Sequence, residues 1–147
     1  MSVGLLDVNA LIALLWDEHP FHRSCAEWFS TAAKTGWATC PMTEAGFVRI
    51  VCSPAFTRRT PSVHNAIQIL KFATESETNH QFWTDDLPIS VLSMRWGDPL
   101  GHKLVTDLYL LSLVAHRRGN LITFDRRIAH LAGLGNLEHE TVRLLTP

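Results

Sequence analysis

The chain has 147 residues, of which 46% are hydrophobic and 18% charged, and its formal net charge at pH 7 is −1. This composition is typical of a soluble globular protein, and we expect residues 1–147 to form a single domain. Binding of nucleic acid by bulk charge scales with the number of phosphates that the protein neutralises. The near-zero charge therefore excludes that mode of binding and leaves only local basic clusters for such a role.

We expect neither a membrane anchor nor a signal peptide. The longest apolar run near the N-terminus, 10–16, has seven residues, whereas a membrane span needs about 20. No basic segment precedes this run, as one would in a signal peptide. The three cysteines, Cys25, Cys40 and Cys52, match no zinc or redox spacing. They are interpreted as reduced thiols, which predicts a cytoplasmic protein.

The first half of the chain predicts alternating strands and helices. Short apolar runs predict strands, and apolar residues at helical spacing predict helices. Gly36 ends one helix, Pro41 begins the next and Pro54 terminates it. The expected strands are 3–6 and 37–40, and the expected helices are 10–16, 20–35, 41–52 and 61–76.

The second half continues the alternation after an irregular segment. Residues 81–84 are a candidate strand, Asp85 and Asp86 a turn, and 95–99 a loop. Helices are then expected at 104–118 and from 126 to 131, and strands at 121–124 and 141–145. Alternating strands and helices predict an α/β fold, a three-layer α/β/α sandwich with a mostly parallel central sheet.

Two aspartates follow predicted strands, where open parallel sheets bind ligands. Asp7 comes after the first strand and Asp125 after the strand at 121–124. Each is also a good N-cap for the helix that follows, and Asp125 has Arg126 and Arg127 as candidate ion-pair partners. Because Asp7 lies among apolar residues, a cap, a cation or a metal must offset the cost of burying its charge.

Two further acids lie on predicted helices. Glu44 is in the first turn of its helix, with a surface pair to Arg49 as the alternative role. Asp107 lies in an apolar helical stretch, where Asp is a poor helix former, and Lys103 is its alternative partner. If these acids and the two strand-end aspartates converge, their charges repel unless a divalent cation neutralises them. Mg²⁺ or Mn²⁺ suits such an all-oxygen site.

Four segments resemble, in order, the motifs of the PIN-domain ribonucleases. They are LLDVN at 5–9, TE at 43–44, VTDLYL at 105–110 and LITFDR at 121–126. The likeness is strongest to the VapC-type toxins of bacterial toxin–antitoxin pairs, and it covers nearly the whole chain. Leu108 departs from the small residue that often follows the third acid in such proteins. The resemblance implies that the catalytic and metal-binding residues are Asp7, Glu44, Asp107 and Asp125.

The same resemblance implies a Mg²⁺- or Mn²⁺-dependent endoribonuclease that leaves 5′-phosphate and 3′-hydroxyl ends. Asn9 and Thr123 would be supporting residues, and Arg126 and Arg127 are the candidates for RNA contacts. The implied partners are an RNA substrate, a cognate antitoxin protein and a second copy of the chain in a homodimer. Apolar residues on the helices that begin at 10 and 41 are candidates for the dimer face.

Residues 78–101 match no motif of the family, so their role stays open. Trp96 in this segment either stacks on an unpaired base or serves as a packing anchor.

Two other functions also remain open. A degenerate PIN-like module would keep the fold and only bind RNA or a protein partner, although the presence of all four acids counts against such decay. A metal-dependent phosphatase of the haloacid-dehalogenase kind also places an aspartate after the first strand. Its chemistry requires a second aspartate two residues later, whereas this chain has Asn9.

Overall fold

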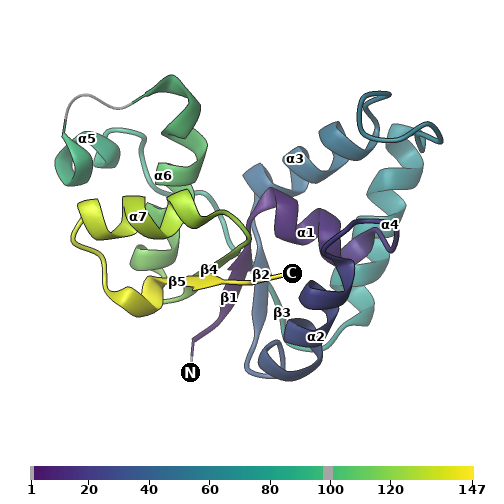
Figure 1. Ribbon diagram of the computed structural model, residues 1–147, viewed down its shortest axis with the longest axis horizontal. Helices are drawn as coiled ribbons and strands as arrows, with labels where there is room; N and C mark the ends of the chain where they lie inside the picture. Colours follow the sequence, from purple (N-terminus) through teal and green to yellow (C-terminus); the bar gives the residue numbers. More distant parts are fainter. Residues whose placement is uncertain (1, 98–100) are drawn as a thin grey trace.

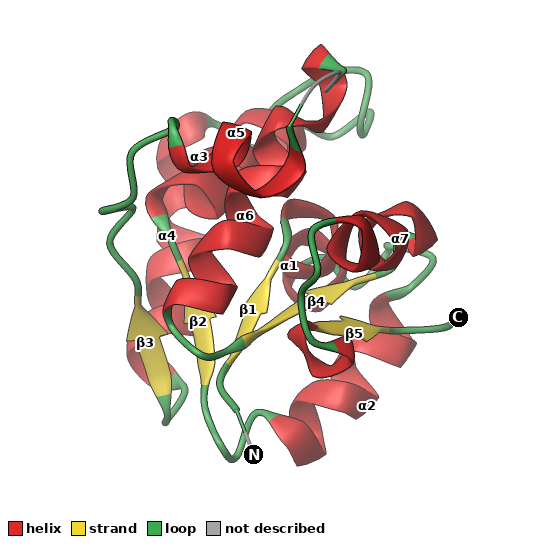
Figure 2. Cartoon of the chain, turned by 90° about the vertical axis from the view of Figure 1, so that its left-hand side faces the viewer, coloured by secondary structure: helices red, strands yellow, loops and turns green. Residues whose placement is uncertain are grey.

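Parallel strands form one continuous sheet in the computed structural model, which describes residues 2–97 and 101–147. The strand order is β3-β2-β1-β4-β5, and each neighbouring pair is parallel. Figure 2 shows the five strands across the molecule. The predicted parallel sheet is confirmed. Its strands are β1 (Gly4–Leu6), β2 (Trp37–Thr39), β3 (His80–Phe82), β4 (Asn120–Thr123) and β5 (Val142–Leu144).

Helices cover both faces of this sheet, with α1 to α4 on one side and α5 to α7 on the other (Figure 1). Side chains of successive strand residues point to opposite faces, so Leu5 packs in one hydrophobic cluster and Leu6 in the other. The predicted three-layer sandwich is confirmed. Its α-helices are α1 (Val8–Leu15), α2 (His22–Ala32), α3 (Pro41–Val51), α4 (Val63–Ser76), α5 (Val91–Trp96), α6 (Val105–His116) and α7 (Arg126–Leu134).

The direction of the sheet connections changes between β1 and β4. The helix that follows β1 packs on one face, and the helix that follows β4 packs on the other. The two strands pair directly, with Leu6 opposite Ile122, and the N–H of Asp7 donates to the Ile122 carbonyl oxygen at 3.0 Å. Because the two loops leave toward opposite faces, this is the position where open α/β sheets bind ligands.

Close packing of α1 against α3 depends on Gly46. A Cβ atom at this position would lie 2.6 Å from Cγ2 of Val8, which is much shorter than a van der Waals contact. Glycine therefore lets α3, whose first turn carries Glu44, approach the start of α1, which follows Asp7.

The segment predicted as a loop at 95–99 is partly helical, so that prediction is wrong for Arg95 and Trp96. Both residues end α5, a helix of six residues that is too short for a periodic signal in the sequence. Asp98 and Pro99 lie outside the described residues. The Nε1–H of Trp96 donates to the Leu131 carbonyl oxygen at 2.8 Å. Trp96 is therefore a packing anchor against α7, one of the two roles considered for it.

The cysteines are free thiols; Cys25 and Cys40 are buried and Cys52 is partly buried. None of the helices in the described part of the chain has both the length and the apolar character needed to cross a bilayer.

Candidate active site

Asp7 is buried at the start of α1, and its two carboxylate oxygens have different partners. Oδ1 accepts a hydrogen bond from the N–H of Ala10 at 2.8 Å, so the predicted N-cap is confirmed. Oδ2 accepts a hydrogen bond from Oγ1 of Thr123 at 2.5 Å. The Thr123 hydroxyl oxygen in turn accepts from the N–H of Asp125 at 3.0 Å. One buried threonine therefore joins the end of β1 to the loop that follows β4.

The N-cap hydrogen bond does not remove the free-energy cost of burying the charge of Asp7. Only 6% of the residue is exposed, and burial raises the pKa of its carboxyl from 3.8 to about 6. The hydrogen bonds from Thr123 and Ala10 oppose this rise, whereas the negative charges of Asp107 and Asp125 add to it. The ion pairs of the described residues include none with Asp7. Its carboxylate therefore sits near two other anions without a cation of its own.

Asp107 lies in the first turn of α6, because the preceding residues form a separate 3-10 turn at His102–Leu104. A carboxylate is favourable near a helix N-terminus, so the cost expected for a mid-helix aspartate is reduced. Burial raises the pKa of Asp107, and the charge of Asp125 raises it further. The alternative pair with Lys103 is not among the ion pairs of residues 2–97 and 101–147.

Asp125 is the N-cap of α7 and is paired with Arg127. Its Oδ1 accepts from the N–H of Arg127 at 2.9 Å, and its Oδ2 accepts from Nη2 of the same residue at 2.6 Å. This side-chain hydrogen bond is the main reason why the pKa of Asp125 is lowered. The positive charge of Arg127 also partly offsets the rise in the pKa of Asp107. Of the two arginines, Arg127 thus lies at the aspartates, and Arg126 is simply exposed.

Glu44 is hydrogen-bonded to Thr39 at the end of β2, and the ion pairs found among the described residues do not include its alternative pair with Arg49. Its Oε1 accepts a hydrogen bond from Oγ1 of Thr39 at 2.6 Å. Oγ1 of Thr39 also lies 2.8 Å from Nε2 of His80. The sequence reasoning missed both residues. Thr39 ends a strand just as Thr123 does, which was a usable signal, but nothing in the sequence relates His80 on β3 to Glu44.

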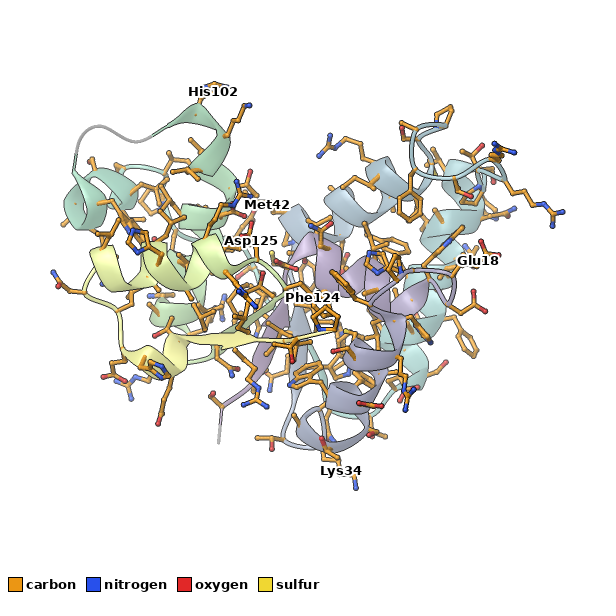
Figure 3. All side chains as sticks on the ribbon, viewed as in Figure 1. Glu18, Lys34, Met42, His102, Phe124 and Asp125 are labelled. Carbon is orange, nitrogen blue, oxygen red and sulfur yellow. The ribbon has the colours of Figure 1, made fainter. Side chains whose placement is uncertain are left out.

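The structure thus brings three of the predicted acids within range of one another's charges, whereas the fourth follows the adjacent strand. Asp7, Asp107 and Asp125 are close enough for their charges to act on one another, and Figure 3 shows Asp125 between the two groups of helices. Glu44 follows the adjacent strand β2, tied to Thr39. Asn9 is exposed in the first turn of α1.

The donor atoms of this site fit a hard divalent cation. Within the described ranges, no three His, Cys, Asp or Glu side chains are already grouped as they would be around a bound ion. The buried, unpaired Asp7 carboxylate nevertheless has the chemistry of a metal ligand, since an all-oxygen donor set with excess negative charge suits Mg²⁺ or Mn²⁺. Such an ion would also offset the repulsion that raises the pKa of Asp7 and Asp107.

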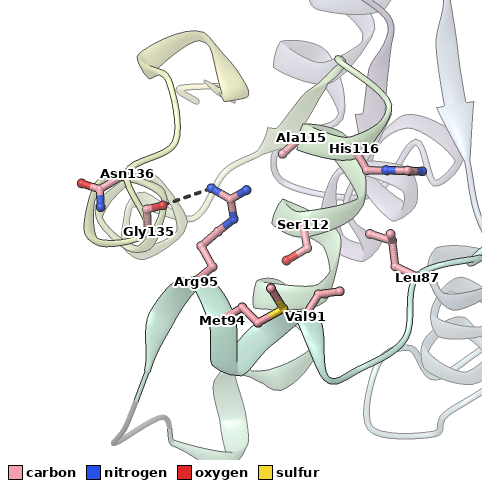
Figure 4. A pocket seen from close by; sticks show the side chains of 9 residues that line it. All are labelled: Leu87, Val91, Met94, Arg95, Ser112, Ala115, His116, Gly135 and Asn136. Carbon is pink, nitrogen blue, oxygen red and sulfur yellow. Dashed lines mark hydrogen bonds between the residues drawn. The ribbon is translucent and has the colours of Figure 1, made fainter.

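A cavity of about 580 Å³ lies away from these acids, between α5, α6 and the chain after α7 (Figure 4). Arg95 reaches across it and donates to the Gly135 carbonyl oxygen at 3.2 Å. None of the predicted site residues lines this cavity.

Known proteins share both the sequence and the fold of this chain. Residues 4–134 match the family model of the PIN domain. Ribonuclease VapC39 of Mycobacterium tuberculosis (strain ATCC 25618 / H37Rv) is 42% identical over 136 residues, which cover 92% of this chain and 97% of that protein. Ribonuclease VapC38 of the same strain is 41% identical over 130 residues, covering 88% and 90%.

A solved structure shows the same fold at low sequence identity. A chain in the crystal structure of VapBC2 from Rickettsia felis, bound to a DNA fragment from their promoter, superimposes with a TM-score of 0.63. The match covers 98% of this chain and 99% of that chain at 10% identity. The family model and the sequence relatives carry the assignment: this chain belongs to the PIN-domain family and, within it, to the VapC-type ribonucleases.

Proposed function

We propose that this protein is an endoribonuclease toxin of a toxin–antitoxin pair and that it requires Mg²⁺ or Mn²⁺. The observation that carries the proposal is the buried Asp7 carboxylate at the end of β1, held by Thr123 and within range of the charges of Asp107 and Asp125. An N-cap role explains one carboxylate at the start of α1, but it does not explain three carboxylates whose negative charges repel one another. The names of the relatives, which are ribonucleases, support RNA as the substrate.

Asp7, Asp107 and Asp125 would hold the cation, with Glu44 at the neighbouring strand end completing the set. A divalent cation bound there supplies Lewis-acid activation of water and of the scissile phosphodiester. Thr123 orients Asp7 by donating to its Oδ2, and this hydrogen bond partly opposes the rise in the pKa of Asp7. Arg127, which is exposed beside the acids, offers a positive charge to the RNA phosphate. The products would carry 5′-phosphate and 3′-hydroxyl ends.

The experiment compares the wild type with Asp7→Asn on RNA, with EDTA and with added Mg²⁺ or Mn²⁺. Asparagine is also a good N-cap, so the fold is expected to persist while metal-dependent cleavage is lost. Asp17→Asn, at an exposed acid after α1, is the matched control and should cleave normally. Mapping of 5′ ends in total RNA after brief expression then identifies the cleaved RNA. Equal cleavage by Asp7→Asn and the wild type would reject the proposal and favour a PIN-like binding module.

We also propose a cognate antitoxin and a homodimer as partners. The apolar residues Ala10 to Ala13 of α1 are buried in the core, so these four residues are not available for a dimer face. Val63, Ile67 and Phe72 on α4 are exposed apolar residues and are better candidates. Light scattering of the wild type and of Phe72→Ser tests whether the chain forms a dimer. Co-purification from a strain that expresses the adjacent genes tests whether an antitoxin binds.

A further inference from the structure

Three polar side chains from β2, α3 and β3 form a continuous hydrogen-bonded chain. Thr39 ends β2, Glu44 lies in the first turn of α3, and His80 begins β3. Oγ1 of Thr39 is 2.6 Å from Oε1 of Glu44 and 2.8 Å from Nε2 of His80. The threonine is the central member of this chain and is completely buried.

The direction of these hydrogen bonds follows from the number of protons available. An ionised carboxylate only accepts hydrogen bonds, so the single hydroxyl proton of Thr39 points to Glu44. The Thr39 oxygen must then accept from His80, which requires the ring proton on Nε2. With the proton on Nδ1 instead, Nε2 would compete with Glu44 for the same hydroxyl proton. The tautomer of His80 therefore determines whether Thr39 can hold Glu44.

Packing fixes the His80 ring in the required position. Trp37 is opposite His80 in the register of β2 and β3, and their ring centroids are 4.5 Å apart. Trp37 itself is completely buried. In a strand, residues two apart point to the same face, so Trp37 and Thr39 present their side chains together to His80. Two adjacent strands and a buried ring thus hold the donor that directs the Thr39 hydroxyl.

We propose that Thr39 and His80 are positioning residues for Glu44, acting through the chain His80 Nε2–H to Thr39 Oγ1–H to Glu44 Oε1. This inference rests on the proposed function, in which Glu44 belongs to the metal-binding set. One carboxylate oxygen is held by the threonine, so the orientation of the other is restricted before a cation binds. Outer residues that orient metal ligands in this way typically change metal affinity or activity by about 10–100-fold when they are lost.

Two matched pairs of variants test the hydrogen-bonded chain. Thr39→Val keeps the shape and removes the hydroxyl, whereas Thr39→Ser keeps the hydroxyl. His80→Leu removes the donor, whereas the side-chain amide of His80→Gln places an N–H close to the position of Nε2. The measurements are Mn²⁺ affinity by electron paramagnetic resonance, and kcat and KM on an RNA oligonucleotide. We expect Thr39→Val and His80→Leu to lose about tenfold in Mn²⁺ affinity and in kcat with KM unchanged, and Thr39→Ser and His80→Gln to recover most of both.

Asp7→Asn and Glu44→Gln, measured alongside, separate this inference from the proposed function. If Asp7→Asn cleaves normally, the proposed function fails. If Asp7→Asn and Glu44→Gln are impaired while Thr39→Val and His80→Leu behave as the wild type, only the positioning role is overturned. If Thr39→Val does not fold, the His80 pair decides, because His80 is partly buried on an edge strand. Equal losses in His80→Leu and His80→Gln would show that the ring matters for packing alone and would overturn the inference.

Discussion

Thr123 donates a hydrogen bond to Asp7 across 116 positions of sequence, with 2.5 Å between Oγ1 and Oδ2. The bond is possible because β1 and β4 are adjacent in the sheet and end at the same edge. Thr123 also accepts from the N–H of Asp125, so the two strand-end aspartates share one partner. Loss of this hydroxyl should therefore disturb both sides of the site at once.

Thr123→Val should destabilise the protein near neutral pH by about 2 kcal/mol, because a buried carboxylate loses a charge-assisted hydrogen bond and a backbone N–H loses its acceptor. The loss should be smaller near pH 4.5, where Asp7, with a pKa of about 6, is mostly protonated. Urea unfolding at the two pH values measures the difference. Thr123→Ser is the control and should stay close to the wild type. An equal loss at both pH values would contradict the role assigned to the hydroxyl.

Asp7 should make the metal-free protein less stable as the pH rises. Its folded-state pKa of about 6 lies above the ordinary 3.8, so its contribution is complete below 3.8 and is lost as the pH rises through about 6. The full effect is about 3 kcal/mol in the free energy of unfolding. The raised pKa of Asp107 changes the free energy of unfolding in the same direction. The lowered pKa of Asp125 has the opposite effect, because its contribution to stability is present above 3.8 and is lost as the pH falls below that value.

Urea unfolding in EDTA between about pH 4 and pH 7 tests this sign. The curve of Asp7→Asn should be flatter than that of the wild type, with the remaining slope due to Asp107. A wild-type stability that rises steadily over this range would show that Asp7 is not the dominant titrating group.

Arg127→Ala should weaken RNA binding with little effect on the midpoint of urea unfolding. The arginine side chain is 78% exposed, and exposed ion pairs contribute little to stability. Removal of one phosphate contact should lower the slope of log affinity against log salt by about 1. Arg126→Ala is the neighbouring control and should change the slope less, because the Arg127 guanidinium lies at Asp125. Equal slopes in the wild type and Arg127→Ala would remove Arg127 from the RNA contacts.

Gly46→Ala should destabilise the protein by about 1–3 kcal/mol, because the added Cβ would lie 2.6 Å from Cγ2 of Val8. Val8→Ala in the same chain should recover part of this loss by making room. Gly133→Ala in α7 is the matched control, since its Cβ would meet nothing within 4 Å, and it should stabilise by about 0.5–1 kcal/mol. Denaturant midpoints of the four proteins give the comparison; a harmless Gly46→Ala would mean that α1 and α3 can separate without cost.

Local patterns predicted most of the fold, and they failed where an element was short or a boundary was subtle. The strands around Leu5 and Leu121 are short buried apolar runs, which are typical of strands in a parallel sheet covered on both faces. The six residues of α5 carry less than two helical turns, so Arg95 and Trp96 were expected in a loop. Asp107 was expected inside an apolar helical stretch, whereas the structure places it in the first turn of α6, because a separate 3-10 turn at His102–Leu104 precedes that helix.

The sequence by itself determined the alternation of strands and helices, the family motifs and the placing of Asp7 and Asp125 at strand ends, because each depends on neighbours along the chain. Only the tertiary structure decided that Thr123 bonds Asp7 and that Thr39 bonds both Glu44 and His80. These contacts depend on strand order, register and the approach of α3 to α1. Hydrogen bonds form only within a few tenths of an ångström of their preferred length, so no local pattern specifies them.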